Sequence, residues 1–260
     1  MGNALSVSQT ANTKFNPYGW SPDLPDHRDK ILKYPRAKKL PTKIDLRDLC
    51  PPVYDQAGLG TSTICAVLSA YQLNQKRILS GDLIIPSRLF TYYNTRISHN
   101  SVDRDSGCSI RDCLKTINKY GLCSESIWPY DPANLFNKPL TLCYEKSIGK
   151  NTLTFHRIIQ IHDQIKSALA DGQPIIFGMS IFPSFLNKNV ADTGIVPMPD
   201  PNEAILGGHS ALLVGYDDDE SYWIVLTSWG EKFGDKGFLY LPYDYFFKEK
   251  KFVTDLWVLK

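Results

Sequence analysis

The stretch from Tyr54 to Tyr71, Y-D-Q-A-G-L-G-T-S-T-I-C-A-V-L-S-A-Y, changes from loop to helix within a few residues. Gly58 and Gly60 predict a tight loop, because glycine adopts positive φ without steric cost. From Thr63 the apolar residues follow the three-and-four spacing of a helix, which we expect over residues 63–79. The start of such a helix carries unpaired backbone N–H groups and the positive end of the helix dipole.

Ser62 lies at this predicted helix start, and two interpretations of it are open. As an N-cap, its hydroxyl would satisfy one unpaired N–H group and contribute about 1 kcal/mol, a job that Thr61 or Thr63 could also do. Alternatively, a helix start behind a glycine loop suits an activated nucleophile, because the dipole stabilises an anion there, most usefully a thiolate. The residue present is a serine, so the second interpretation needs support from elsewhere in the chain.

The composition is that of an ordinary globular protein. Of 260 residues, 43% are hydrophobic and 22% are charged, which suffices for one large core or two packed halves. The net charge of +2 is spread along the chain, so we expect no nucleic-acid partner. The six cysteines fit no zinc-site spacing, and we read them as reduced, buried side chains. We expect no metal and no cofactor.

The first 17 residues predict a flexible or anchoring tail. They lack the apolar segment of a signal peptide, and the longest apolar stretch, 174–182, is too short to span a membrane. The opening M-G-N-A-L-S matches the N-myristoylation pattern with Gly2 as acceptor. We therefore expect an intracellular protein, cytoplasmic or virion-associated and not classically secreted, which contacts a membrane only if Gly2 is myristoylated.

Residues 18–43 predict an extended N-terminal arm. Tyr18 and Trp20 need burial, while the prolines that follow exclude a long helix. Two placements are open: the arm covers a cleft as a pro-segment, or it packs on the back of the body.

The remaining pattern predicts an α+β fold, with a helical half followed by a β half. Apart from 63–79, helices are expected over 86–96, 110–120 and 162–171, and strands over 153–158, 174–182, 211–216, 222–226, 237–240 and 252–259. Ser109 and Gly121 have the residue types of caps for the third helix. We divide the domain 44–260 into a helical lobe of about 56–130 and a β lobe of about 131–250.

Three further residues have the side chains for catalysis. Gln56 lies across the glycine loop from Ser62 and could donate to an oxyanion. His209, in G-G-H-S at the start of a predicted strand, is a general-base candidate. Thr227, in L-T-S-W-G, could orient the His209 ring, with Trp229 shielding the contact from water. Each signal also has an ordinary interpretation. Gln56 could be a loop glutamine that bonds nearby carbonyls, His209 a histidine of the core, and Trp229 a side chain that simply packs in the core.

Taken in this order, the motifs resemble those of the papain-like (C1) cysteine peptidases. Asp-Gln-x-Gly-x-Gly before the helix, Gly-Gly-His and Ser-Trp-Gly carry the resemblance, with Trp128-Pro129-Tyr130 as a further piece. Leu59 in the loop matches the cathepsin-like branch seen in bacteria and large DNA viruses. The resemblance covers about residues 18–247.

The resemblance implies a fold of two lobes, helical and β-barrel-like, with a cleft between them that binds a peptide or protein substrate. Ser62 takes the position of the nucleophilic cysteine, Gln56 that of the oxyanion glutamine, and His209 that of the catalytic histidine. Thr227 replaces the asparagine that orients the histidine. Substrate-binding residues by the same match are Ser106, Gly107, Ser210 and Trp229.

The departures predict that this chain has little or no peptidase activity. A serine hydroxyl does not form the thiolate–imidazolium pair on which papain chemistry depends. Cys65 lies one turn inside the helix and cannot replace a cysteine at position 62 as the nucleophile. Two explanations are open: an engineered Cys→Ser change in a working peptidase, which we favour, or a naturally inactive protein with a binding or structural role, such as virion assembly.

Overall fold

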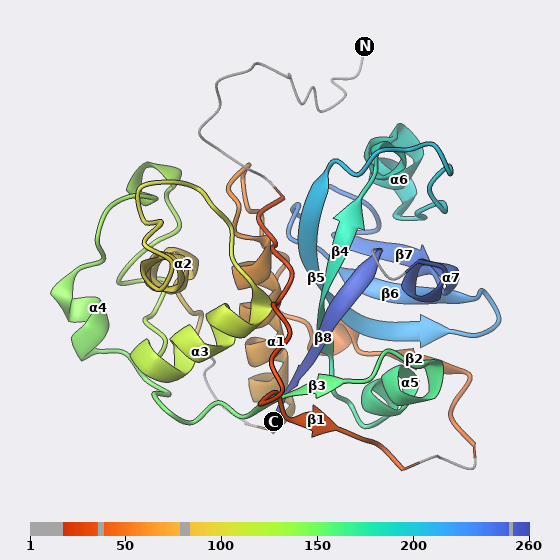
Figure 1. Ribbon diagram of the computed structural model, residues 1–260, viewed down its shortest axis with the longest axis horizontal. Helices are drawn as coiled ribbons and strands as arrows, with labels where there is room; N and C mark the ends of the chain where they lie inside the picture. The colour runs from red at the N-terminus through yellow and green to blue at the C-terminus, as the bar shows by residue number, and fades with distance from the viewer. Residues whose placement is uncertain (1–17, 36–38, 79–83, 250–251) are drawn as a thin grey trace.

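The chain folds into a helical part and a sheet part that lie side by side, with α1 between them (Figure 1). The computed structural model describes residues 18–35, 39–78, 84–249 and 252–260. Its helices are α1 (Ser62–Ile78), α2 (Arg88–Ile97), α3 (Ile110–Tyr120), α4 (Thr141–Glu145), α5 (His162–Ala170), α6 (Lys188–Thr193) and α7 (Asp244–Phe247). Its strands are β1 (Ile31–Leu32), β2 (Lys43–Asp45), β3 (Phe155–Ile158), β4 (Ile175–Ile181), β5 (Gly207–Asp217), β6 (Tyr222–Leu226), β7 (Phe238–Pro242) and β8 (Val253–Leu259).

The helix boundaries follow the local capping chemistry. α3 has its predicted bounds: the Ser109 hydroxyl accepts a backbone N–H three residues on, and Gly121 ends the helix at a φ of 75°. α2 begins two residues later than predicted, because Ser87 is its N-cap. α1 begins one residue earlier than predicted, at Ser62. The predicted stop signal after α1, Ser80-Gly81, lies outside the described residues.

The sheet is open, so the predicted barrel-like lobe is wrong in that respect. Its strand order is β1-β3-β8-β4-β5-β6-β7, with β2 paired to β5, and in the described residues the end strands β1 and β7 do not pair with each other. Pairing is antiparallel except between β1 and β3. The α+β class and the predicted strands of the second half are confirmed, each to within a few residues.

Two apolar cores hold the fold together, one on each face of the sheet. α1 packs on β5, β4 and β8, and its apolar side chains share a core with Ile176, Leu212 and Trp257. On the other face, α5 and α7 cover a second core that contains Phe177, Met179 and Leu213. Alternation along β4 and β5 therefore places neighbouring residues on opposite faces.

The division into lobes at residues 130–131 stays a prediction. Leu135, and Cys143 of α4, still pack in the first core with the helices, and after residue 130 the chain returns to the sheet only at β3. The short elements β1, β2, α4, α6 and α7 were not predicted, because so few residues show no periodicity.

Candidate active site

Ser62 lies where the helical part, the sheet and the N-terminal arm meet. It is the first residue of α1 and is fully buried. Its Oγ donates to the Tyr18 carbonyl at 3.1 Å and accepts from the Ser210 N–H of β5 at 3.3 Å. One hydroxyl at the helix start thus contacts both the sheet and the arm.

Gln56 is held beside this point by the glycine loop and the segment after β6. Its Nε2 donates to the Leu59 carbonyl and its Oε1 accepts from the Ser228 Oγ, each at 2.7 Å. Its backbone N–H donates to the Ser228 carbonyl at 2.9 Å. Sequence reasoning did not identify Ser228 as a contact of Gln56, since nothing local links positions so far apart in the chain.

His209 is buried on β5, directly before Ser210. Its ring packs on Trp229 with the ring centroids 4.7 Å apart. Neither ring nitrogen has a hydrogen-bond partner within the described residues. Ser62 and His209 therefore lie at one junction without the direct hydrogen bond of a nucleophile and its base.

Thr227 does not orient His209, which corrects the prediction. The Thr227 N–H and Oγ1 both donate to the carbonyl of Gly237, at 3.0 and 3.1 Å. The hydroxyl also accepts from the Trp229 N–H at 3.5 Å. A threonine hydroxyl is short, and here it bonds to the adjacent backbone rather than to the ring.

The N-terminal arm occupies the space between the two parts, as its trace along α1 in Figure 1 shows. We call residues 18–21 the plug. On the helical side, the Cys108 N–H donates to the Gly19 carbonyl at 2.8 Å, and the Ser21 N–H donates to the Cys108 carbonyl at 3.2 Å. On the sheet side, the Trp20 N–H donates to the Gly208 carbonyl at 3.1 Å. Residues 18–21 of the arm therefore lie in the cleft, whereas residues 31–34 pack against β3 and α5.

The plug approaches the backbone on both sides more closely than side chains would allow. Gly19 has a φ of 42°, and a Cβ added there would lie 2.2 Å from the Gly60 carbonyl oxygen. A Cβ added to Gly107 would lie 1.9 Å from the Gly19 carbonyl oxygen. Glycine at both positions is therefore what lets the arm enter.

The predicted substrate-binding edge, Ser106 and Gly107, is braced by the residue that precedes it, Asp105. The buried Asp105 carboxylate accepts from the Gly60 N–H at 2.8 Å and from the Tyr92 hydroxyl at 2.5 Å. The Gly107 N–H donates to the same tyrosine oxygen at 2.8 Å. The Ser106 hydroxyl contacts that of Ser101 at 3.0 Å.

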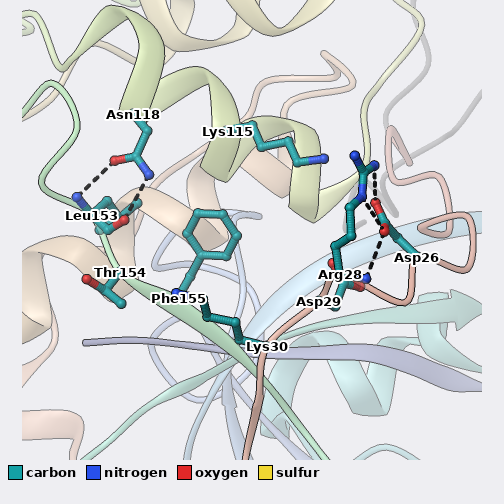
Figure 2. Close-up of a pocket in the computed structure, with 9 residues that line it drawn as sticks. All are labelled: Asp26, Arg28, Asp29, Lys30, Lys115, Asn118, Leu153, Thr154 and Phe155. Atoms are coloured by element: carbon teal, nitrogen blue, oxygen red, sulfur yellow. Dashed lines mark hydrogen bonds and ion pairs between the residues drawn. The ribbon is translucent and has the colours of Figure 1, made fainter.

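Hollows on the surface of the described residues include two that the arm lines. One of about 350 Å³ lies between the arm and the helical part and is lined by Ser21, Pro22, Ser106, Gly107 and Cys108 among others. The other, of about 450 Å³, lies between the arm residues 26–30, α3 and the segment before β3 (Figure 2). Its aromatic wall is Phe155, and Asn118 bonds to the backbone of Leu153 at one end of it. Neither hollow is lined by Ser62 or His209.

None of the cysteines takes over the nucleophile position. All six are free, and all except the half-buried Cys50 are buried. Cys65 lies inside α1, and burial raises its pKa to about 11. A thiol with that pKa stays protonated at neutral pH and is a poor nucleophile.

We expect the His209 imidazole to stay neutral to well below pH 5 while the plug is docked. Burial lowers its pKa to about 3, whereas in the unfolded chain it would titrate near about 6.5. The stability linked to this group is complete above that value and is lost as the pH falls, because the unfolded state binds the proton first. NMR titration of the ring tests this, and a midpoint near 6.5 in the folded chain would contradict it.

Comparison with known proteins places the fold in a family. The papain family cysteine protease model matches residues 40–248, so the chain belongs to that family. An uncharacterized peptidase C1-like protein of Acanthamoeba polyphaga mimivirus is 36% identical, over 94% of this chain and 86% of that protein.

Solved structures agree. Xylellain, a cysteine protease from Xylella fastidiosa, superposes with a TM-score of 0.84 at 35% identity, covering 96% of this chain and 97% of its own. Digestive procathepsin L 3 of Tenebrio molitor gives a TM-score of 0.63 at 19% identity, over 82% of this chain and 68% of that one, and shows the fold alone.

Attachment to a membrane and an intracellular location stay predictions. Gly2, the candidate myristoylation site, lies outside the described residues. Among the residues that are described, no helix is both long and apolar enough to cross a bilayer.

Proposed function

We propose that this chain is a papain-type peptidase scaffold whose peptide-binding cleft is closed by its own plug and whose nucleophile position is held by Ser62. The observation that carries the proposal is the position of the Ser62 hydroxyl. It lies at the start of α1, bonded to the backbone N–H next to His209 and to the plug. A peptide bond entering the cleft would meet the hydroxyl where the Tyr18 carbonyl now lies.

The proposed roles follow from what each group can donate or accept. Ser62 would attack the carbonyl carbon, and His209 would accept the hydroxyl proton and return it to the leaving amine. The Gln56 Nε2 would stabilise the oxyanion after leaving the Leu59 carbonyl, with the Ser62 N–H as second donor. The backbone N–H and carbonyl of Cys108 would bond the substrate backbone as they bond Gly19 and Ser21.

In its plugged state the chain is expected to be inactive for three separate reasons. The cleft is filled, the nucleophile is a hydroxyl rather than a thiol, and burial makes His209 a weak base with a pKa of about 3. Displacing the plug would open the cleft and would raise the pKa of His209 by admitting water to the ring. Only a cysteine at position 62 would replace the hydroxyl with a thiol nucleophile.

The arm beyond the plug is built into the fold, which supports closure in cis. β1 pairs with β3, and the Tyr34 N–H and carbonyl both bond to Gln164 at 2.8 and 2.9 Å. The buried Asp23 carboxylate accepts from Arg157 at 2.9 Å and from the Trp257 Nε1 at 2.8 Å. Procathepsin L 3, which shares the fold, is by its name a proform, which fits an N-terminal segment of this kind.

A second candidate function is a binding or structural role without catalysis, such as assembly into a virion. Two observations favour it: the hydroxyl at position 62, and the Thr227 hydroxyl that bonds to Gly237 while both His209 nitrogens lack a partner within the described residues. In that case the cleft would bind a peptide segment without cleaving it.

The test is Ser62→Cys in the full chain, assayed with a fluorogenic peptide library from pH 5 to 8 and with an epoxide probe. We expect turnover and labelling of the introduced thiol at position 62, both increased by Gly19→Ala, which displaces the plug. The unchanged chain is the control and should show neither. Absence of both turnover and labelling in the double variant would overturn the peptidase proposal and leave the binding role.

A further inference from the structure

We propose that Tyr130 is a positioning residue for the proposed oxyanion hole: its hydroxyl holds both ends of the glycine loop 56–61 and so fixes where the Gln56 carboxamide lies. The inference rests on the proposed function and adds to it a residue that does not itself touch the substrate. Tyr130 is the last residue of the Trp128-Pro129-Tyr130 motif, none of which belongs to the predicted catalytic set.

One hydroxyl group bonds the glycine loop at its two ends. The Tyr130 hydroxyl donates to the Gln56 carbonyl at 2.8 Å, and its oxygen lies 2.7 Å from the Thr61 Oγ1. A tyrosine hydroxyl has a single proton, so with that proton on the Gln56 carbonyl it accepts the hydrogen bond of Thr61. Burial raises the pKa of Tyr130, which keeps the donated proton in place at neutral pH.

The loop needs this support because its backbone is strained. Ala57 has a φ of 48°, a conformation that a residue with a Cβ keeps only where its surroundings fix it. Within the loop, the Asp55 carboxylate accepts from the Ala57 N–H at 2.8 Å, and the Leu59 N–H donates to the Gln56 carbonyl at 2.9 Å. The turn therefore closes on the Gln56 carbonyl oxygen, the same atom to which Tyr130 bonds.

Tyr130 is itself held by an arginine and a glutamate. The Arg88 guanidinium carbon lies 3.7 Å from the centroid of the Tyr130 ring, a cation–π contact. The Glu125 carboxylate accepts from the Arg88 Nη2 and from the Tyr130 N–H, each at 3.0 Å. The Arg88 Nη1 also donates to the Asp55 carbonyl at 3.1 Å, directly before Gln56. The three side chains thus form one unit that contacts the loop at several points.

The segment that carries Tyr130 is fixed to the start of α2. Trp128 is buried in the first core, and its carbonyl accepts from the Ser87 Oγ at 2.6 Å. Pro129 then restricts the backbone between Trp128 and Tyr130. The hydroxyl therefore extends from a rigid part of the helical lobe.

The consequence for catalysis follows from which atoms of Gln56 are held. Ser228 donates to the side-chain Oε1 at 2.7 Å and orients the carboxamide, whereas Tyr130 fixes the backbone from which the carboxamide extends. The Gln56 Nε2 would have to leave the Leu59 carbonyl to bind an oxyanion, and that backbone sets where it can reach. Loss of the Tyr130 hydroxyl should therefore weaken oxyanion stabilisation and leave the substrate-binding edge at Cys108 intact.

The first test is a double-mutant cycle in the full chain carrying Ser62→Cys and Gly19→Ala. Tyr130→Phe should lower kcat at least about tenfold and change KM less than about threefold, because the oxyanion forms only after the substrate has bound. With Gln56→Ala already present, Tyr130→Phe should lower kcat less than about twofold further, since the group through which it acts is gone.

Tyr144→Phe is the control for removing a tyrosine hydroxyl from the helical part. The Tyr144 hydroxyl donates to the Asn94 Oδ1 at 3.1 Å, and we expect its loss to leave kcat and KM unchanged. An equal fall of kcat from Tyr130→Phe with and without Gln56 would show a general structural role and overturn the inference. So would an unchanged kcat in the first background.

The second test needs no catalysis and keeps Ser62. Hydrogen exchange of the Leu59 amide, which donates to the Gln56 carbonyl, reports whether the loop is closed. Tyr130→Phe should speed this exchange at least about tenfold, while amides in the middle of α1 stay protected and Tyr144→Phe changes neither. Equal exchange of the Leu59 amide in all three chains would contradict the support by Tyr130. If no variant hydrolyses any peptide, the proposed function fails, and this series alone decides whether Tyr130 holds the loop.

Discussion

The full chain carrying Ser62→Cys and Gly19→Ala is expected to hydrolyse peptides at least about 10³-fold faster than the chain with Ser62 and Gly19. The thiol can form an ion pair with His209 once water reaches the ring, which the serine hydroxyl cannot do. The methyl group at position 19 would lie 2.2 Å from the Gly60 carbonyl oxygen, so the plug cannot dock. Initial rates on a fluorogenic peptide measure the effect.

Gly149→Ala is the matched control for the arm. Gly149 also has a positive φ, of 76°, but an added Cβ would meet nothing closer than 3.5 Å. The Gly149→Ala substitution therefore adds the same kind of backbone strain as Gly19→Ala without touching the cleft. Ser62→Cys with Gly149→Ala should remain as slow as Ser62→Cys alone, and a rise equal to that of the Gly19 variant would show that the plug does not limit the rate.

Arg157→Leu is expected to destabilise the folded chain by about 3–5 kcal/mol, the usual effect of breaking a buried ion pair. The Arg157 guanidinium binds Asp29 at 2.6 Å, Asp23 at 2.9 Å and Asp255 at 3.0 Å. Removing it leaves the largely buried Asp23 and Asp255 without that positive charge, and burial already raises the pKa of Asp255. Urea unfolding, followed by far-UV circular dichroism, measures the loss.

Arg28→Gln provides the comparison for that result. Arg28 also pairs with an aspartate of the arm, Asp26, but its side chain is 75% exposed, and exposed ion pairs contribute little. We expect its unfolding midpoint to stay close to that of the parent chain. If both arginine variants lost the same stability, the buried network would not be what anchors the arm.

Much of the fold could be predicted from local signals. The α3 bounds followed from Ser109 and Gly121, whose caps act within one helical turn, and the apolar run 174–182 predicted β4. The grouping of Ser62, Gln56 and His209 at one junction was predicted from the order of motifs together with the family resemblance. Their individual catalytic roles remain proposals.

The remainder depends on contacts between residues far apart in the chain. Whether the sheet closes is decided by how its strands twist and pair, so the barrel-like lobe could not be checked from alternation. Thr227 was paired with His209 by analogy with an asparagine, whereas its shorter side chain bonds to the backbone of Gly237. The fit of Gly19 between Gly60 and Gly107 is visible only in three dimensions.

Closure of the cleft by the plug is tested most directly by the rate at which iodoacetamide alkylates the thiol introduced by Ser62→Cys in the folded chain, followed by peptide mass spectrometry. We predict slow labelling in Ser62→Cys alone and with Gly149→Ala, and labelling at least about tenfold faster with Gly19→Ala. Equal rates in all three chains would show that residues 18–21 do not cover the side chain at the start of α1, and would contradict closure in cis.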